Sequence, residues 1–240
     1  MSNEQPRLFG KLEEPSVESY QIERLEKAYV SFLPGIKMEE SFQDIEDYQD
    51  LHDLVIECQR CRLRSSCQQV VFGDGNIHAD ILFIGEGPGQ DEDRQGIPFV
   101  GRAGQLLNKI LAAAEFERQE IYIANVVKCR PPGNRLPSPD EVKECRNYLE
   151  AQIRIIKPRI VVCLGSLACQ TVIDPKAKIS LTRGKWFIRN GVKIMASYHP
   201  AALLRNESYK RPTWEDFKLI RDEYKSLKAR QMRCDDAYNG

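Results

Sequence analysis

The sequence lacks any long apolar run. Its longest apolar stretches include ILFIG at 81–85 and IVVCLG at 160–165, and these are far shorter than the ~20 residues that a membrane-spanning helix requires. The opening residues, MSNEQPRLFGKLEE, also lack the apolar core of a secretory signal. We therefore expect a cytoplasmic protein with no membrane partner.

Net charge is absent as well, because 35 Lys and Arg balance 35 Asp and Glu. The balance hides an uneven distribution, since residues 1–57 carry 5 basic and 14 acidic side chains and residues 58–240 carry 30 and 21. A basic body is compatible with a polyanionic partner, although a solvated surface explains it equally well. We expect an acidic extension over 1–45, one folded domain over 46–232 and a tail over 233–240.

Short apolar runs alternate with helical stretches through the body of the chain. The pattern predicts strands at 81–85, 121–127, 160–165 and 192–197, and helices at 103–115, 139–156, 166–173 and 213–231, with Ser138 as an N-cap. Further helices are expected at 18–32 and 41–57. Such alternation predicts a mostly parallel, four-stranded sheet covered by helices on both faces. Ligands bind outside the carboxyl ends of such strands, so functional residues should follow them directly.

Eight cysteines remain to be explained in a chain without an export signal. In a reducing compartment, metal ligation or burial is more usual than a disulfide framework. Cys58 and Cys61 form a C-x2-C pair, and Cys129 and Cys145 are separated by 15 residues. This spacing suits either zinc or an iron–sulfur cluster, with buried free thiols as the third possibility. Cys67 is ambiguous.

The glycine-rich segment after the first strand has no G-K-[ST], and Gln90 breaks the dinucleotide fingerprint. What remains is a loop whose glycine-rich backbone can approach a ligand closely. It is lined with the carboxylates of Glu86, Asp91, Glu92 and Asp93. Such a loop is a poor phosphate cradle, but it can orient a water or stabilise a cationic transition state. A solvated acidic turn is the simpler alternative.

Histidine is scarce, with only three in the chain. One of them, His199, lies in SYHPAALLR at the carboxyl end of the last predicted strand. This position favours a functional role, although a lone histidine is more often structural. The residues that follow, PAALLR, predict a short helix with an apolar tip and a basic end.

Taken together, these motifs resemble the type-4, iron–sulfur uracil-DNA glycosylases. The resemblance rests on GEGPGQDEDRQGIPFVGRAGQLL at 85–107, IANVVKCRPPGNRLP at 123–137, HPAALLR at 199–205 and four cysteines. It runs from about Cys58 to Trp214. It implies a three-layer α/β/α sandwich and hydrolysis of the N-glycosidic bond between uracil and deoxyribose in DNA, on a nucleotide flipped out of the helix. Covalent capture of uracil, known from a related group, is not expected, because the loop after Asn125 contains no histidine.

The resemblance also implies a role for each site residue. Phe99 stacks on the flipped base, Asn125 reads its Watson–Crick edge, and His199 donates to uracil O2 as negative charge develops there. Glu86 orients the attacking water, and Glu92 is a second carboxylate near the pocket. The backbone of Gly85 to Gly87 contacts the base.

For the cofactor, the resemblance implies a structural 4Fe–4S cluster held by Cys58, Cys61, Cys129 and Cys145, with Cys67 outside the ligand set. The DNA contacts that we expect come from the apolar tip and the basic residues around it, Leu203, Leu204, Arg205, Lys128, Arg130, Arg135, Arg183 and Lys185. We expect a monomer. The alternatives are an iron–sulfur electron carrier or redox sensor on a flavodoxin-like sheet, and a nucleic-acid-binding module without catalysis.

Overall fold

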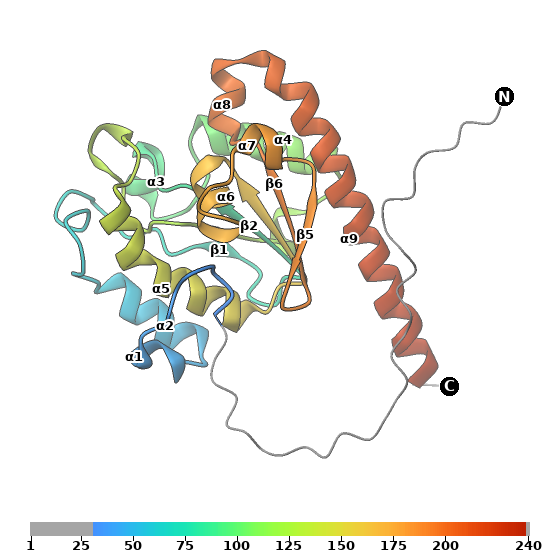
Figure 1. Ribbon diagram of the computed structural model, residues 1–240, viewed down its shortest axis with the longest axis horizontal. Helices are drawn as coiled ribbons and strands as arrows, with labels where there is room; N and C mark the ends of the chain where they lie inside the picture. Colours follow the sequence, from blue (N-terminus) through green and yellow to red (C-terminus); the bar gives the residue numbers. More distant parts are fainter. Residues whose placement is uncertain (1–30, 239–240) are drawn as a thin grey trace.

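The computed structural model describes residues 31–238, except for the side chains of Glu40 and of 232–238. A sheet in the order β1-β3-β2-β4-β6-β5 forms its centre (Figure 1). The four predicted strands are confirmed as β2 (Ile81–Gly85), β3 (Tyr122–Asn125), β4 (Ile160–Leu164) and β6 (Val192–Ser197), and they are mutually parallel.

The prediction of four strands was too low, because the sheet has six. The two additional strands are antiparallel edges, β1 (Asp74–Gly75) and β5 (Trp186–Arg189). β1 is too short to leave a hydrophobic pattern, and β5 exposes Ile188 instead of burying a continuous apolar run. Asn190 and Gly191 join β5 to β6 with positive φ angles of 50° and 78°, which is the Asn-Gly hairpin signal that the strand analysis overlooked.

Helices cover both faces of the sheet, as predicted (Figure 1). Leu82 and Ile84 face one core, shared with α2 (Tyr48–Ile56), α5 (Pro139–Ile156) and α6 (Ser166–Val172), while Ile81 and Phe83 face the other core, shared with α4 (Arg102–Ala113) and α9 (Lys210–Tyr238). The strands are apolar on both sides because both sides are buried. The remaining helices are short: α1 (Glu40–Gln43), α3 (Gln90–Gln95), α7 (Ile179–Thr182) and α8 (Pro200–Arg205).

The continuous helix expected over 41–57 is wrong. The chain leaves α1 after Gln43 and enters α2 at Tyr48, where the Asp47 carboxylate caps α2 by accepting from the N–H groups of Gln49 and Asp50. A capping aspartate within an apolar pattern restarts the helix. By contrast, α5 begins where predicted, with Ser138 as its N-cap in a capping box with Glu141.

The segment just before α1 packs into the domain, so the boundary expected at residue 45 falls inside a packed region. Leu33 and Met38 are buried against the core. The carboxylate of Glu150 on α5 accepts hydrogen bonds from the backbone N–H groups of Phe32 and Leu33. The helix predicted at 18–32 lies almost wholly outside the described residues. No helix in the described part of the chain is both long enough and apolar enough to cross a membrane.

Candidate active site

A cavity of about 660 Å³ lies at the carboxyl ends of the parallel strands. Glu86 follows β2, Asn125 ends β3, and His199 precedes α8 after β6. Phe99 comes from the loop between α3 and α4. All four side chains line this one cavity. The chain positions that the resemblance singled out are therefore brought together by the parallel order of the strands.

Two rings and a glycine shape the cavity. The Phe99 and His199 ring centroids are 5.5 Å apart, with the planes tilted by 31°. A Cβ added to Gly85 would lie 2.6 Å from Phe99 Cζ and 2.4 Å from Asn125 Oδ1, so only glycine fits between them. Phe99 itself has a φ of 56°, a left-handed conformation that is rare and costly for a bulky residue and recurs at ligand sites.

Asn125 has an unsatisfied oxygen inside the cavity. The residue is 2% exposed, and no described residue donates a hydrogen bond to its buried Oδ1. An unpaired buried acceptor costs about 1–3 kcal/mol, and such atoms are uncommon in folded proteins. The arrangement can accept a hydrogen bond from a ligand that brings its own N–H.

His199 is held as a neutral donor. Its Nδ1 accepts a hydrogen bond of 3.1 Å from the Ala201 backbone N–H, so the ring proton lies on Nε2. Burial, assisted by the positive charge of Arg205, lowers the pKa of His199 to about 4. The imidazole is therefore uncharged near neutral pH, and Nε2–H is free to donate to a ligand.

The two carboxylates of the glycine-rich loop differ. Burial raises the pKa of Glu86, and the charge of Arg205 opposes that rise. No described residue donates a hydrogen bond to the Glu86 carboxylate. Glu92 also borders the cavity, but its oxygens accept hydrogen bonds from the backbone N–H groups of Gly89, Val100 and Gly101, at 3.1, 3.0 and 2.8 Å. Glu92 ties the loop around Phe99 together, and Glu86 retains free acceptor capacity.

Two of the side chains expected to contact DNA are buried, so that expectation is wrong for them. Lys128 is 1% exposed and Leu203 is 2% exposed. The side chain of Lys128 folds inward beyond the end of β3, and Leu203 lies on the inner face of α8. Leu204, Arg205 and Lys185 are exposed.

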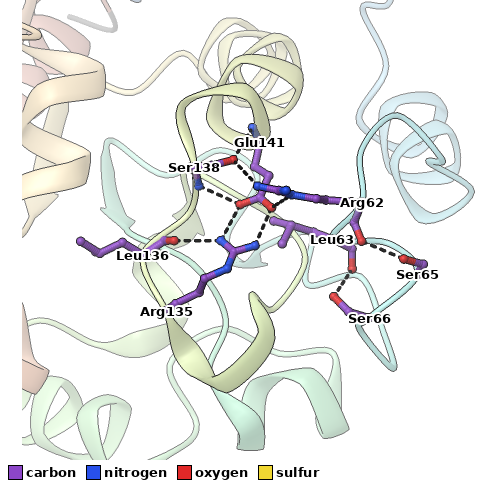
Figure 2. Close-up of polar contacts among 8 residues, drawn as sticks. All are labelled: Arg62, Leu63, Ser65, Ser66, Arg135, Leu136, Ser138 and Glu141. Carbon is purple, nitrogen blue, oxygen red and sulfur yellow. Dashed lines mark hydrogen bonds and ion pairs between the residues drawn. The ribbon is translucent and has the colours of Figure 1, made fainter.

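The other three arginines in that set have partners inside the protein. Arg183 pairs with Asp216 and Arg130 with Asp93. Arg135 donates to both oxygens of the Glu141 carboxylate, at 2.7 and 2.8 Å, and Arg62 approaches the same carboxylate (Figure 2). These bonds lower the pKa of Glu141 well below its usual range. The bonds hold the loop of 130–138 along the rim of the cavity.

Leu136 on this loop is a feature that the sequence analysis missed. It lines the cavity mouth and is 69% exposed. A leucine between Arg135 and Pro137, in a segment otherwise rich in turn-forming residues, is the signal that could have identified it. Together with Leu204 it gives the cavity region two exposed apolar side chains.

The cysteines gather beside the same loop. Cys58, Cys61, Cys67, Cys129 and Cys145 all pack against one core. Burial raises the pKa of Cys145 to about 12, and the neighbouring Cys61 and Cys58 contribute to the rise. Burial also raises the pKa of Cys129, and the neighbouring Cys67 adds to the rise.

This donor set fits an iron–sulfur cluster in its chemistry. The buried thiols of Cys129 and Cys145, whose pKa values are raised, ionise readily only where a cationic centre balances their charge. Among the described residues, no three His, Cys, Asp or Glu side chains are arranged to hold a single metal ion. A 4Fe–4S cluster binds four cysteine thiolates, and these ligands need not converge on a single ion.

Residues 72–218 match the family described as the Uracil DNA glycosylase superfamily. The chain is 45% identical to the type-4 uracil-DNA glycosylase of Thermotoga maritima, over 64% of this chain and 81% of that protein. It is 42% identical to that of Archaeoglobus fulgidus, over 73% of this chain and 92% of that protein. The type-5 uracil-DNA glycosylase of Pyrobaculum aerophilum is 31% identical, over 54% of this chain.

The extent of these matches agrees with the geometry of the cavity, since the matched residues include all four side chains that meet there. The chain therefore belongs to the uracil DNA glycosylase superfamily and, within it, to the type-4 uracil-DNA glycosylases.

Proposed function

We propose that this protein hydrolyses the N-glycosidic bond of a deoxyuridine flipped out of DNA, releasing uracil and leaving an abasic site for base excision repair. The observation that carries the proposal is the unpartnered Oδ1 of Asn125 inside the cavity. Uracil presents an N–H at N3 for that oxygen and a carbonyl at C4 for the amide nitrogen. Cytosine presents an amino group instead of the carbonyl, so two donors face each other.

The bond cleavage assigns a task to each polar group. As the bond between C1′ and N1 breaks, the electron pair stays on uracil and its charge reaches O2. His199 donates from Nε2 to that oxygen, and because the charge is larger in the transition state than in the substrate, the hydrogen bond accelerates the reaction. Glu86 orients a water toward C1′, offsets the positive charge on the sugar and accepts the proton that the water loses.

DNA would approach over the rim of the cavity. Leu136 lines the cavity and Leu204 precedes the lining residue Arg205; both are exposed apolar side chains, suited to replacing or supporting bases next to the extruded nucleotide. Arg205 and Lys185 are exposed cations available to phosphates. Arg130, Arg135 and Arg183 belong to the same proposed DNA surface, with each guanidinium paired to a carboxylate of the protein. The protein acts on uracil-containing DNA as a cytoplasmic monomer in this proposal.

A 4Fe–4S cluster would be held by Cys58, Cys61, Cys129 and Cys145. When bound, it supplies a covalent tie between the C-x2-C turn, the loop after β3 and helix α5, and no electron transfer is needed for hydrolysis. An iron–sulfur electron carrier, the alternative from the sequence, leaves the unpartnered Asn125 and the neutral His199 without a role.

The test is an alkaline cleavage assay. A labelled single strand with one uracil is incubated with the purified protein and heated in alkali, which breaks the strand at abasic sites. We expect cleavage at the uracil and none in a matched strand with cytosine or thymine. Intact strands after incubation with cluster-loaded protein would contradict the proposal.

A further inference from the structure

Lys128 is a charged side chain that the proposed mechanism does not use. It lies three residues after Asn125 and directly before Cys129. At 1% exposure, it cannot reach a DNA phosphate. A buried ammonium is costly unless it is paired, yet no described carboxylate forms an ion pair with it. Its position needs another explanation.

The side chain of Lys128 turns back onto the strand that carries Asn125. Its Nζ donates a hydrogen bond of 2.9 Å to the backbone oxygen of Asn125 and a second to Oε1 of Gln152 on α5. Gln152 in turn donates to the backbone oxygen of Phe72, at 3.0 Å. The carbonyl at the end of β3 is therefore fixed to the helix layer through two side chains, both fully buried.

The backbone of the same residue contacts the cysteine group. Lys128 is joined by its peptide bond to Cys129, and its side-chain nitrogen lies near the sulfur of Cys145. Its carbonyl accepts from the Val71 N–H at 2.7 Å. One residue thus contacts Asn125 through its side chain and is joined to a cysteine of the group through its backbone.

We propose that Lys128 is a positioning residue that couples the base-reading Asn125 to the cysteine cluster. The side-chain nitrogen uses its hydrogen bonds to Asn125 and Gln152 to hold the end of β3, and the peptide bond to Cys129 joins that end to the cysteine cluster. Base reading needs the Asn125 amide in a narrow range of positions, because Gly85 and Phe99 leave no spare room around it. Displacements of about 1 Å can cost 10²-fold in rate. This inference rests on the proposed function.

The first test compares Lys128→Met, which keeps the length and removes the charge, with Lys128→Arg, which keeps the charge. Lys176→Met, at an exposed lysine that is not among the residues lining the cavity, is the matched control. We expect Lys128→Met to lower kcat for uracil release about 10- to 100-fold, with a KM change under about threefold. Iron release to a chelator should be faster than in wild type. Lys128→Arg should recover part of both losses. A Lys128→Met protein with wild-type kcat and wild-type iron release would overturn the proposal.

A double-mutant cycle separates positioning from general damage. Because Lys128 acts through Asn125, Lys128→Met should lower kcat much less in an Asn125→Ala background than in wild type. Equal losses in both backgrounds would overturn the coupling. If Lys128→Met does not fold, Gln152→Leu removes one acceptor and leaves the charge, and it should reproduce the same non-additivity. Wild-type protein inactive on uracil would refute the proposed function, whereas the iron-release comparison would still test the link to the cysteines.

Discussion

The segment between β3 and α5 is built in opposite ways at its two ends. At the β3 end, the side-chain oxygen of Asn125 is buried without a protein partner. At the α5 end, the carboxylate of Glu141 accepts hydrogen bonds from two arginines and from the Ser138 N–H (Figure 2). Both residues are buried and polar. An unpaired buried acceptor that also lines a cavity, as Asn125 Oδ1 does, is suited to a ligand, whereas the paired carboxylate of Glu141 serves the fold.

The same contrast separates the two glutamates of the glycine-rich loop. The Glu92 carboxylate accepts hydrogen bonds from three backbone N–H groups. The Glu86 carboxylate accepts none from the described residues and interacts only with the nearby charge of Arg205. The resemblance suggested roles for both near the pocket. The structure favours Glu86 as the residue that works on the substrate and Glu92 as the one that shapes the loop.

The largest effect on catalytic rate is expected at His199, one of the residues with hydrogen-bonding capacity left free for a ligand. His199→Ala removes the donor to uracil O2, and kcat should fall about 10²- to 10³-fold. Single-turnover kinetics on a uracil-containing strand measure the loss, and binding of the same strand reports whether affinity is retained. A fall in affinity with an unchanged single-turnover rate would contradict the assigned role.

Asn125→Asp should change selectivity rather than only rate. A protonated or rotated carboxyl can accept from the cytosine amino group, so discrimination between uracil and cytosine should fall at least about tenfold. Parallel assays on strands with uracil or cytosine measure the ratio. Glu92→Gln serves as the matched control, and selectivity there should stay at the wild-type value. Unchanged discrimination in Asn125→Asp would refute the base-reading role.

Glu141→Gln tests whether a buried carboxylate with all its partners inside the protein contributes to stability rather than to activity. The substitution keeps the shape but weakens the bonds to Arg135 and Arg62, whose own side chains are 40% and 70% exposed. Because solvent screens these pairs, the loss in the free energy of unfolding should be about 1–2 kcal/mol, measured by denaturant titration. The uracil release rate should change little. A large loss of kcat without a loss of stability would show that Glu141 serves catalysis rather than the fold.

The smallest expected effect is on the pH dependence of stability, through His199. The folded-state pKa of His199 is lowered from 6.5 to about 4, so the unfolded chain binds more protons between these values. The contribution of His199 to stability is therefore fully present above pH 6.5 and is lost as the pH falls toward 4. Thermal melts across this window should show a shallower decline in His199→Gln than in wild type. Identical slopes would indicate that the ring is not held neutral.

Activity should respond to acid through a different group. Burial raises the pKa of Glu86, and the proposed base must be ionised. The uracil release rate should therefore fall as the pH drops, starting above the usual range of a glutamate, and this acid limb should be absent from the pH profile of Glu86→Gln.

Much of the fold could be predicted from the sequence. The four parallel strands appear as continuous apolar runs because both of their faces are buried, and α5 is marked by its capping residues Ser138 and Glu141. Edge strands such as β5 carry no such signal, since only part of one face is covered. The apolar spacing over 41–57 continues across Asp47 and so predicts one helix. In the structure Asp47 caps a new helix, and this local capping interrupts the pattern.

Recognition of the site followed from the motifs around Glu86, Phe99, Asn125 and His199. The sequence by itself determined which residue types follow each strand, because strand order and chain order together bring those positions to one edge of the sheet. Only the tertiary structure decided which charges face solvent. Lys128 is buried and Arg205 exposed, and Leu203 lies inside and Leu204 outside, because burial depends on what packs against a side chain from distant parts of the chain.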